Sequence, residues 1–255
     1  METTRIIAII SQKGGVGKTS LVQNLGAELA ERGQRVLMID FDPQANLTEG
    51  WGIDPWEQRP TIYHAMTGDV PTADARITVR PNLDLLPASL NLAGADPHFA
   101  GSIDRHIRLQ KALRPVEAEY DFILIDGPPS LGFFVNSALM AANEIIIPLQ
   151  VHGYAFMALD PLMEIVEAAQ GMNEGLRITG VVLTMYDRRN NLSATVAEAA
   201  RERFETLVYQ TVIPINVKIA EAPLVGKPVA EYDSNSTGAV AYRELAKEVL
   251  DGREG

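Results

Sequence analysis

Short apolar runs alternate along the chain with longer stretches in which apolar and polar residues are mixed. The apolar runs are rich in Val, Ile and Leu and predict buried strands over residues 5–10, 35–39, 83–87, 121–125, 144–149, 177–184 and 211–213. The mixed stretches predict helices over residues 18–31, 132–142, 155–169, 194–205 and 239–250. Buried strands that alternate with helices are typical of a parallel sheet with helices on both faces. We therefore expect an α/β fold with a doubly wound, mostly parallel sheet.

The stretch from residue 51 to residue 112 has the least regular pattern. It begins rich in Pro and Trp and ends rich in Gly and Asp. We interpret it as loops and short helices that lie over the strand ends, and not as a second domain. A chain of 255 residues is short enough for one α/β domain. We therefore expect a single domain over residues 1–255.

Composition excludes several classes of function. The chain is 46% hydrophobic and 22% charged, as ordinary globular proteins are. It contains no cysteine, which excludes disulfides, iron–sulfur clusters, thiol catalysis and cysteine-bound zinc. No leader pattern and no long apolar segment stand out, so we expect a cytoplasmic protein without a membrane partner. The net charge of −11 repels DNA overall, so any DNA contact needs a local basic patch.

The first predicted strand runs directly into S-Q-K-G-G-V-G-K-T-S at residues 11–20, and a predicted helix follows. Glycines let successive backbone N–H groups turn toward phosphate oxygens, and the helix N-terminus adds its positive dipole end. Lys18 is then expected to reach the β- and γ-phosphates, and the Thr19 hydroxyl to bind Mg²⁺. The residues expected to hold the nucleotide are Gly14, Gly15, Val16, Gly17, Lys18, Thr19 and Ser20.

This loop departs from the ordinary G-x-x-x-x-G-K-[ST] pattern. Gln12 occupies the position of the first glycine, and a second lysine, Lys13, follows it. The loop resembles the deviant Walker A motif, K-G-G-x-G-K-[ST], of the ParA/MinD family of P-loop ATPases. That resemblance implies a dimer that sandwiches two nucleotides, in which Lys13 reaches the phosphates of the partner subunit. The alternative for Lys13 is an ordinary solvated loop lysine.

Three aspartates follow predicted strands at the edge where parallel sheets bind ligands. Asp40 and Asp42 lie in D-F-D-P-Q-A-N at residues 40–46, which resembles the D-x-D-P-Q-x-N segment of the same family. The resemblance implies that Asp42 orients the attacking water and that Asp40 supports the Mg²⁺ shell, so that Lys13, Lys18, Asp42 and Asp40 form the catalytic set. The alternative for both aspartates is a turn or helix-capping role.

Asp126 ends an apolar strand and begins D-G-P-P-S, where the family has D-x-P-P-S. A carboxylate in that position is the Walker B layout and is expected to hold Mg²⁺ together with Thr19 and Asp40. The resemblance also implies that residues 127–132 act as a switch that senses the γ-phosphate.

The resemblance continues through the C-terminal half. I-P-L-Q at 147–150, L-T-M-Y-D at 183–187, V-I-P-I-N-V at 212–217 and E-A-P at 221–223 are similar, in order and spacing, to segments of Soj-type chromosomal ParA proteins. It therefore covers essentially the whole chain. It implies that Met185, Pro214 and Asn216 surround the adenine, and the alternative is that they are plain turn residues.

The basic patch expected of such proteins is reduced here. Ile215 stands where an arginine is usual, and residues 231–238 contain no basic side chain. The remaining candidates for DNA contact are Arg188, Arg189, Lys218, Lys227 and Arg243. The alternative for each is a solvated surface charge.

The pattern as a whole favours a Mg²⁺-dependent ATPase with weak basal activity that uses ATP/ADP as a switch. The resemblance implies an ATP-dependent homodimer that binds DNA non-specifically, associates with the nucleoid and segregates a chromosome or plasmid with a ParB-like activator. One alternative is a related ATPase that positions a protein cargo, which the reduced basic patch favours. Another is a P-loop small-molecule synthase, which Lys13 argues against, and a non-hydrolysing scaffold is disfavoured by Asp42.

Overall fold

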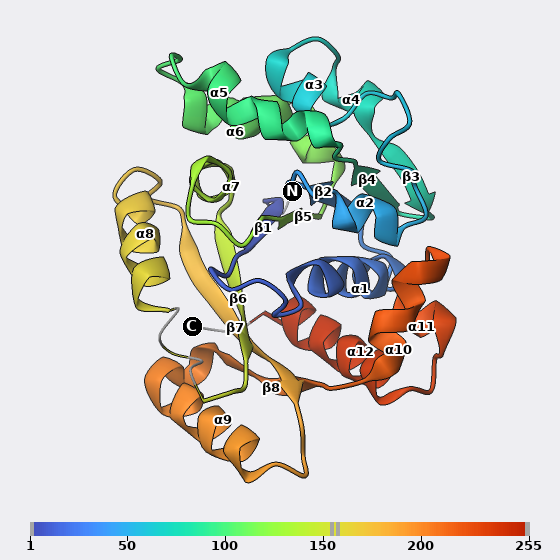
Figure 1. The fold of residues 1–255 in the computed structure, drawn as a ribbon, viewed down its shortest axis with the longest axis vertical. Coiled ribbons are helices and arrows are strands. Elements are labelled where there is room, and N and C mark those ends of the chain that lie inside the picture. Colours follow the sequence, from blue (N-terminus) through green and yellow to red (C-terminus); the bar gives the residue numbers. More distant parts are fainter. Residues whose placement is uncertain (1–2, 154–155, 157–158, 253–255) are drawn as a thin grey trace.

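The computed structural model describes residues 3–153, 156 and 159–252. In this part of the chain the strands form an eight-stranded sheet with the order β3-β4-β2-β5-β1-β6-β7-β8 (Figure 1). Neighbouring strands run parallel, except that β3 is antiparallel to β4. The strands are β1 (Arg5–Ile9), β2 (Val36–Asp40), β3 (Ile77–Arg80), β4 (Leu83–Leu86), β5 (Phe122–Asp126), β6 (Glu144–Gln150), β7 (Arg177–Tyr186) and β8 (Val208–Pro214).

Helices cover both faces of the sheet, which confirms the expected doubly wound α/β fold (Figure 1). Helices α1 and α12 pack on one face, and α7, α8 and α9 pack on the other. The described α-helices are α1 (Lys18–Glu31), α2 (Asn46–Gly50), α3 (Ile62–Thr67), α4 (Thr72–Ala75), α5 (Ala95–Phe99), α6 (Arg108–Leu113), α7 (Phe133–Ala141), α8 (Asp160–Gln170), α9 (Asn191–Phe204), α10 (Val217–Glu221), α11 (Val229–Tyr232) and α12 (Thr237–Leu250).

Alternate residues of each central strand enter different cores. In β1, Ile6 and Ala8 join the core under α7, whereas Ile7 and Ile9 join the core under α1. A strand covered on both faces has no solvent side, which is why its sequence is a continuous apolar run. None of the described helices is long and apolar enough to cross a membrane.

The element boundaries differ from the expected ones where local capping decides them. Helix α8 was expected from residue 155, which lies outside the described residues, and it begins at Asp160 with Pro161 in its first turn. Proline favours that position because the first helical N–H groups have no partner inside the helix. Helix α9 begins three residues earlier than expected, because the Asn190 side chain accepts a hydrogen bond from the Leu192 N–H and caps it.

The irregular stretch from residue 51 to residue 112 contains α3, α4, α5 and α6, short helices as expected. It also contains β3, an edge strand that the apolar pattern does not predict, and β4 joins it to the parallel sheet. Strand β8 starts at Val208, three residues before the predicted strand.

Candidate active site

The carboxyl ends of β1, β2 and β5 meet at one edge of the sheet. Ile9 and Asp40 both pair in register with Asp126, so the loop after β1 and two aspartates are neighbours. This is the edge at which open parallel sheets bind ligands. The topology therefore brings together residues that are far apart in the chain, such as Ile9, Asp40 and Asp126.

The loop between β1 and α1 is shaped by glycines. Gly15 and Gly17 have φ angles of 71° and 92°, in the left-handed region that a side chain disfavours. No described side chain caps the start of α1, so its first N–H groups are available to an anion. The Thr184 hydroxyl donates to the Val16 carbonyl at 2.9 Å and ties the loop to β7. These features suit a phosphate cradle.

Lys18 lies inside this cradle. Only 7% of the residue is exposed, and its Nζ donates to the Lys13 carbonyl oxygen at 3.4 Å. Burial lowers the pKa of Lys18, while the charges of Asp126 and Asp42 act to raise it. The buried ammonium is therefore placed among the carboxylates that the sequence singled out.

Asp40 and Asp126 are both buried, side by side at the ends of β2 and β5, but they differ in their partners. One oxygen of Asp40 accepts from the Thr48 N–H at 2.7 Å and from the Thr48 hydroxyl at 2.6 Å, and the other accepts from the Asp42 N–H at 3.3 Å. Among the described residues, neither oxygen of Asp126 has a hydrogen bond of good geometry. Asp40 therefore anchors α2, whereas the carboxylate of Asp126 is available to bind a ligand.

The electrostatics of the two groups follow from this difference. Burial raises the pKa of Asp40 to about 6, against the opposing effect of its hydrogen bonds from Thr48. Burial and the charge of Asp40 raise the pKa of Asp126 well above its ordinary value, and the Thr19 hydroxyl and the Lys18 ammonium only partly oppose this. A buried carboxylate without partners is costly, and an added cation would relieve it.

The residues present fit Mg²⁺. A carboxylate and a hydroxyl are the hard oxygen ligands that this ion prefers. Asp126 at the end of β5 interacts with the hydroxyl of Thr19 in the first turn of α1. Asp40 has both oxygens engaged within its own chain, so its predicted place near the ion stays a prediction. The described residues contain no cluster of His, Asp and Glu that would form a separate metal site.

Asp42 lies just beyond β2, half-buried, where its Oδ1 accepts from the Gln44 N–H at 3.0 Å. That contact is the turn role foreseen as the alternative. Burial lowers the pKa of Lys18, and the charge of Asp42 acts to raise it. The expected switch, residues 127–132, begins at the same edge. A Cβ added to Gly14 would lie 3.8 Å from the side chain of Pro129, so this segment lies against the phosphate loop.

A pocket of about 300 Å³ adjoins the phosphate loop. Met185, Pro214 and Asn216, the residues expected around adenine, all line it. The other lining residues include Ile213, Ile219 and Tyr242, which the sequence patterns did not single out. The lining is mostly apolar, as a planar base requires.

Asn216 is engaged within its own chain. Its Oδ1 accepts from the Lys218 N–H at 2.8 Å and caps α10, and its Nδ2 donates to the Thr237 hydroxyl at 2.7 Å. The structure shows that Asn216 caps α10. The expectation that its side-chain amide pairs with the edge of the adenine stays a prediction.

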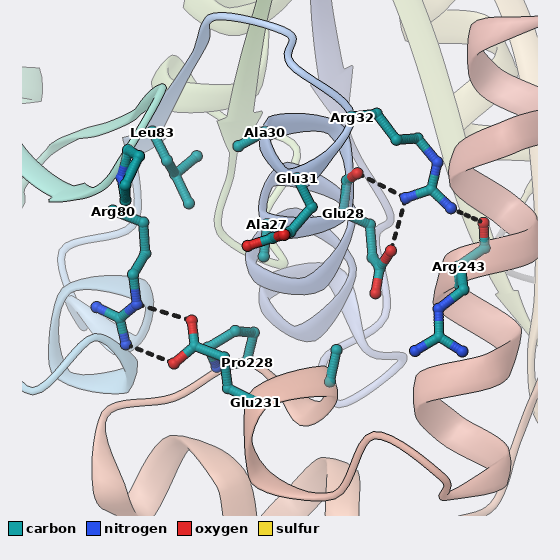
Figure 2. A pocket seen from close by; sticks show the side chains of 12 residues that line it. Ala27, Glu28, Ala30, Glu31, Arg32, Arg80, Leu83, Pro228, Glu231 and Arg243 are labelled. Atoms are coloured by element: carbon teal, nitrogen blue, oxygen red, sulfur yellow. Dashed lines mark hydrogen bonds and ion pairs between the residues drawn. The ribbon is translucent and has the colours of Figure 1, made fainter.

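The five candidate DNA-binding side chains do not form one free basic patch. Arg189 pairs with Asp187 at 3.1 Å, and Lys218 pairs with Glu221 at 2.9 Å. Arg243 lines a separate cleft of about 420 Å³ that also holds Glu28, Glu31 and Glu231, together with Arg32 and Arg80 (Figure 2). Arg188 and Lys227 are exposed.

Comparison with known proteins agrees with this geometry. A family model described as an AAA domain matches residues 4–178. The chain is 46% identical over 247 residues to the sporulation initiation inhibitor protein Soj of Bacillus subtilis, covering 96% of this chain and 98% of that protein. It is 45% identical over 250 residues to the chromosome partitioning protein ParA of Caulobacter vibrioides, covering 96% and 94%.

A solved structure extends the likeness to a nucleotide complex. Cobyrinic acid a,c-diamide synthase from Mycobacterium smegmatis, with a bound ATP analogue and magnesium, aligns with a TM-score of 0.88 at 34% identity. The alignment covers 97% of this chain and 94% of that one. The chain has the phosphate loop and the paired aspartates, and it is 46% and 45% identical to Soj and ParA over 96% of its length. It therefore belongs to the Soj/ParA family of P-loop ATPases.

Proposed function

We propose that this chain is a Mg²⁺-dependent ATPase that partitions a chromosome or plasmid. The observation that carries the proposal is the buried carboxylate of Asp126, which has no hydrogen bond of good geometry to any described residue and lies beside Lys18 and Thr19, near the open N-terminus of α1. The chain is 45% identical, over 96% of its length, to a protein named for chromosome partitioning, and this supports partitioning as the process that the ATPase serves.

The residues would act on ATP mainly by position and charge. The backbone N–H groups from Gly14 to Thr19 and the Lys18 ammonium would hold the phosphates. Asp126 and the Thr19 hydroxyl would hold Mg²⁺, which neutralises charge on the β- and γ-phosphates when bound. Asp42 would orient the attacking water with its carboxylate. We expect slow basal turnover, because a switch needs a long-lived ATP-bound state.

The dimer is the second part of the proposal. Two ATP-bound subunits would associate face to face, each Lys13 reaching the phosphates held by its partner. The dimer would bind DNA non-specifically and so associate with the nucleoid in the cytoplasm. A ParB-like protein would then stimulate hydrolysis and return the subunits to the monomer.

DNA binding is the part that the surface supports least. Arg188, Arg189 and Lys227 are exposed, although Arg189 pairs with Asp187. Lys218 is half-buried and pairs with Glu221, and Arg243 is half-buried at the edge of a cleft. Six exposed cations in a dimer would give a log–log salt slope of about −5 if all engaged phosphates. Co-sedimentation with DNA should therefore require ATP, fail with ADP or without nucleotide, and weaken steeply between 50 mM and 200 mM salt.

The same experiment tests the second candidate, an ATPase that positions a protein cargo. The interrupted basic patch favours that reading. Absence of DNA binding at 50 mM salt, in a protein that still dimerises with ATP, would support cargo positioning and exclude the DNA-bound form.

A small-molecule synthase remains a third candidate because of the likeness to the Mycobacterium smegmatis protein. Such an enzyme needs an acceptor for the activated phosphoryl or acyl group. Hydrolysis of ATP that proceeds without any added acceptor, and that DNA or a partner stimulates, would exclude it.

A further inference from the structure

The side chain of Lys13 turns back onto its own subunit. Its Nζ donates to Gln150 Oε1 at 2.8 Å and lies 2.6 Å from His152 Nε2. Gln150 is the last residue of β6, the strand beside β1, and His152 follows it by two positions. Lys13 is therefore tied to the neighbouring strand end while its carbonyl oxygen accepts from Lys18.

Lys13 donates in both contacts, and Gln150 and His152 accept. An ammonium has donors only, so His152 must accept through an unprotonated Nε2. Burial and the charge of Lys13 lower the pKa of His152, which favours the neutral ring. Gln150 offers its amide oxygen as the second acceptor. Lys13 thus has two acceptors in cis, both neutral.

The contact is also built into the phosphate loop. Gln150 pairs in register with Thr184 of β7, and the Thr184 hydroxyl holds the Val16 carbonyl of the loop. The strand end that holds the Lys13 side chain is therefore fastened to the strand that holds the loop backbone. The position of Lys13 is set by two strands rather than by the loop alone.

We propose that Gln150 and His152 are positioning residues that hold Lys13 within its own subunit until a nucleotide-bound partner replaces them. The inference rests on the proposed dimer, in which Lys13 acts in trans. Each subunit must then break its Lys13 contacts to form the dimer, so the two acceptors lower the dimer's affinity and favour the monomer. Neutral acceptors suit this role, because a carboxylate would hold the ammonium more strongly.

Two substitutions at Gln150 should change dimerisation in opposite directions. Gln150→Met removes an acceptor at similar size, and we expect ATP-dependent dimerisation to tighten about three- to tenfold per subunit, or about ten- to a hundredfold for two. Gln150→Glu introduces a carboxylate, and we expect the dimer to weaken by a similar factor. Gln210→Glu adds the same charge at an exposed position of β8 and should leave the dimer unchanged. A shift of both Gln150 variants in the same direction would overturn the proposal.

A second readout tests the contact without the dimer. In the nucleotide-free protein, an NMR titration of the His152 ring, assigned with His152→Gln, should give a higher pKa in Lys13→Met than in the parent chain. An unchanged His152 pKa would show that Lys13 is not held there and would overturn the inference. If the titration shifts but the parent chain never dimerises with ATP, the proposed function fails while the cis contact stands.

Discussion

Replacing Asp126 by asparagine should stabilise the nucleotide-free protein and abolish ATP hydrolysis. Asp126 is 1% exposed, and neither oxygen has a well-formed hydrogen bond among the described residues. Asp40, paired with it in register, adds a second negative charge. Asparagine keeps the shape of the side chain and removes its charge, so the change isolates the electrostatic effect.

The magnitude follows from the burial of the carboxylate. A buried polar group without a partner costs about 1–3 kcal/mol, and a charged one costs more. The Lys18 ammonium and the Thr19 hydroxyl offset part of that cost for Asp126. We therefore expect a net gain of about 2 kcal/mol at pH 8, which raises the melting temperature of a chain of this size by about 4–8 °C.

The gain should depend on pH with a defined sign. Burial raises the pKa of Asp126, so the folded protein carries the unfavourable ionised form only above that raised pKa. As the pH falls through this raised pKa, Asp126 takes up a proton, and the parent chain regains the stability that the ionised carboxylate had cost. The stability advantage of Asp126→Asn should be largest at pH 8 and shrink on acidification.

Asp40→Asn is the matched control. Both oxygens of Asp40 accept hydrogen bonds, and an amide would place an N–H group against one of these donors. It should therefore lower the melting temperature at pH 8. Differential scanning fluorimetry measures the melting temperatures, and a phosphate-release assay measures ATP hydrolysis. An Asp126→Asn protein that melts at or below the parent temperature, or that hydrolyses ATP normally, would refute the reasoning.

Two further substitutions test the site and the sheet. Lys18→Ala should abolish ATP binding in titration calorimetry, because the phosphates lose the cation at the centre of the cradle, and near-normal affinity would contradict the phosphate-loop assignment. Gly180→Ala should lower the free energy of unfolding by about 1–3 kcal/mol, because its Cβ would lie 2.1 Å from a ring carbon of Tyr209. Urea denaturation measures this loss, and unchanged stability would show that the ring of Tyr209 moves away freely.

The central strands were predictable because their sequence carries the burial pattern directly. The apolar runs of β1, β2, β5 and β6 are covered on both faces, so each is readable without tertiary information. Strand β3 was not predicted because its four residues, I-T-V-R, are half-exposed or exposed at the sheet edge. A short alternating segment of this kind does not differ from a loop in the sequence.

The location of the candidate site could be predicted where it depends on local motifs, and its detailed contacts could not, because they depend on packing. Lys18, Thr19 and the aspartates follow strands in recognisable motifs, and the fold brings them to one edge. Tyr242 of α12 lines the pocket only because the last helix packs against α1, and the sequence motifs do not show this packing. The different partners of Asp40 and Asp126 likewise depend on Thr48, a residue that no motif marks.

The same limit applies to surface charge. Arg189, Lys218 and Arg243 read as free bases in the sequence, yet Asp187 and Glu221 pair with the first two. Arg243 lines a cleft in which Arg32 and Arg80 already pair with Glu28 and Glu231 (Figure 2). Net charge along the chain does not reveal which pairs the fold will form.

The central claim is that ATP drives a dimer through Lys13, and one measurement tests it most directly. Light scattering with ATP should show a dimer for Asp42→Ala, which binds ATP but is not expected to hydrolyse it. The double variant Lys13→Ala, Asp42→Ala should run as a monomer, because two charge-assisted contacts worth about 1.5–2 kcal/mol each are lost. A double variant that still dimerises with ATP would contradict the account.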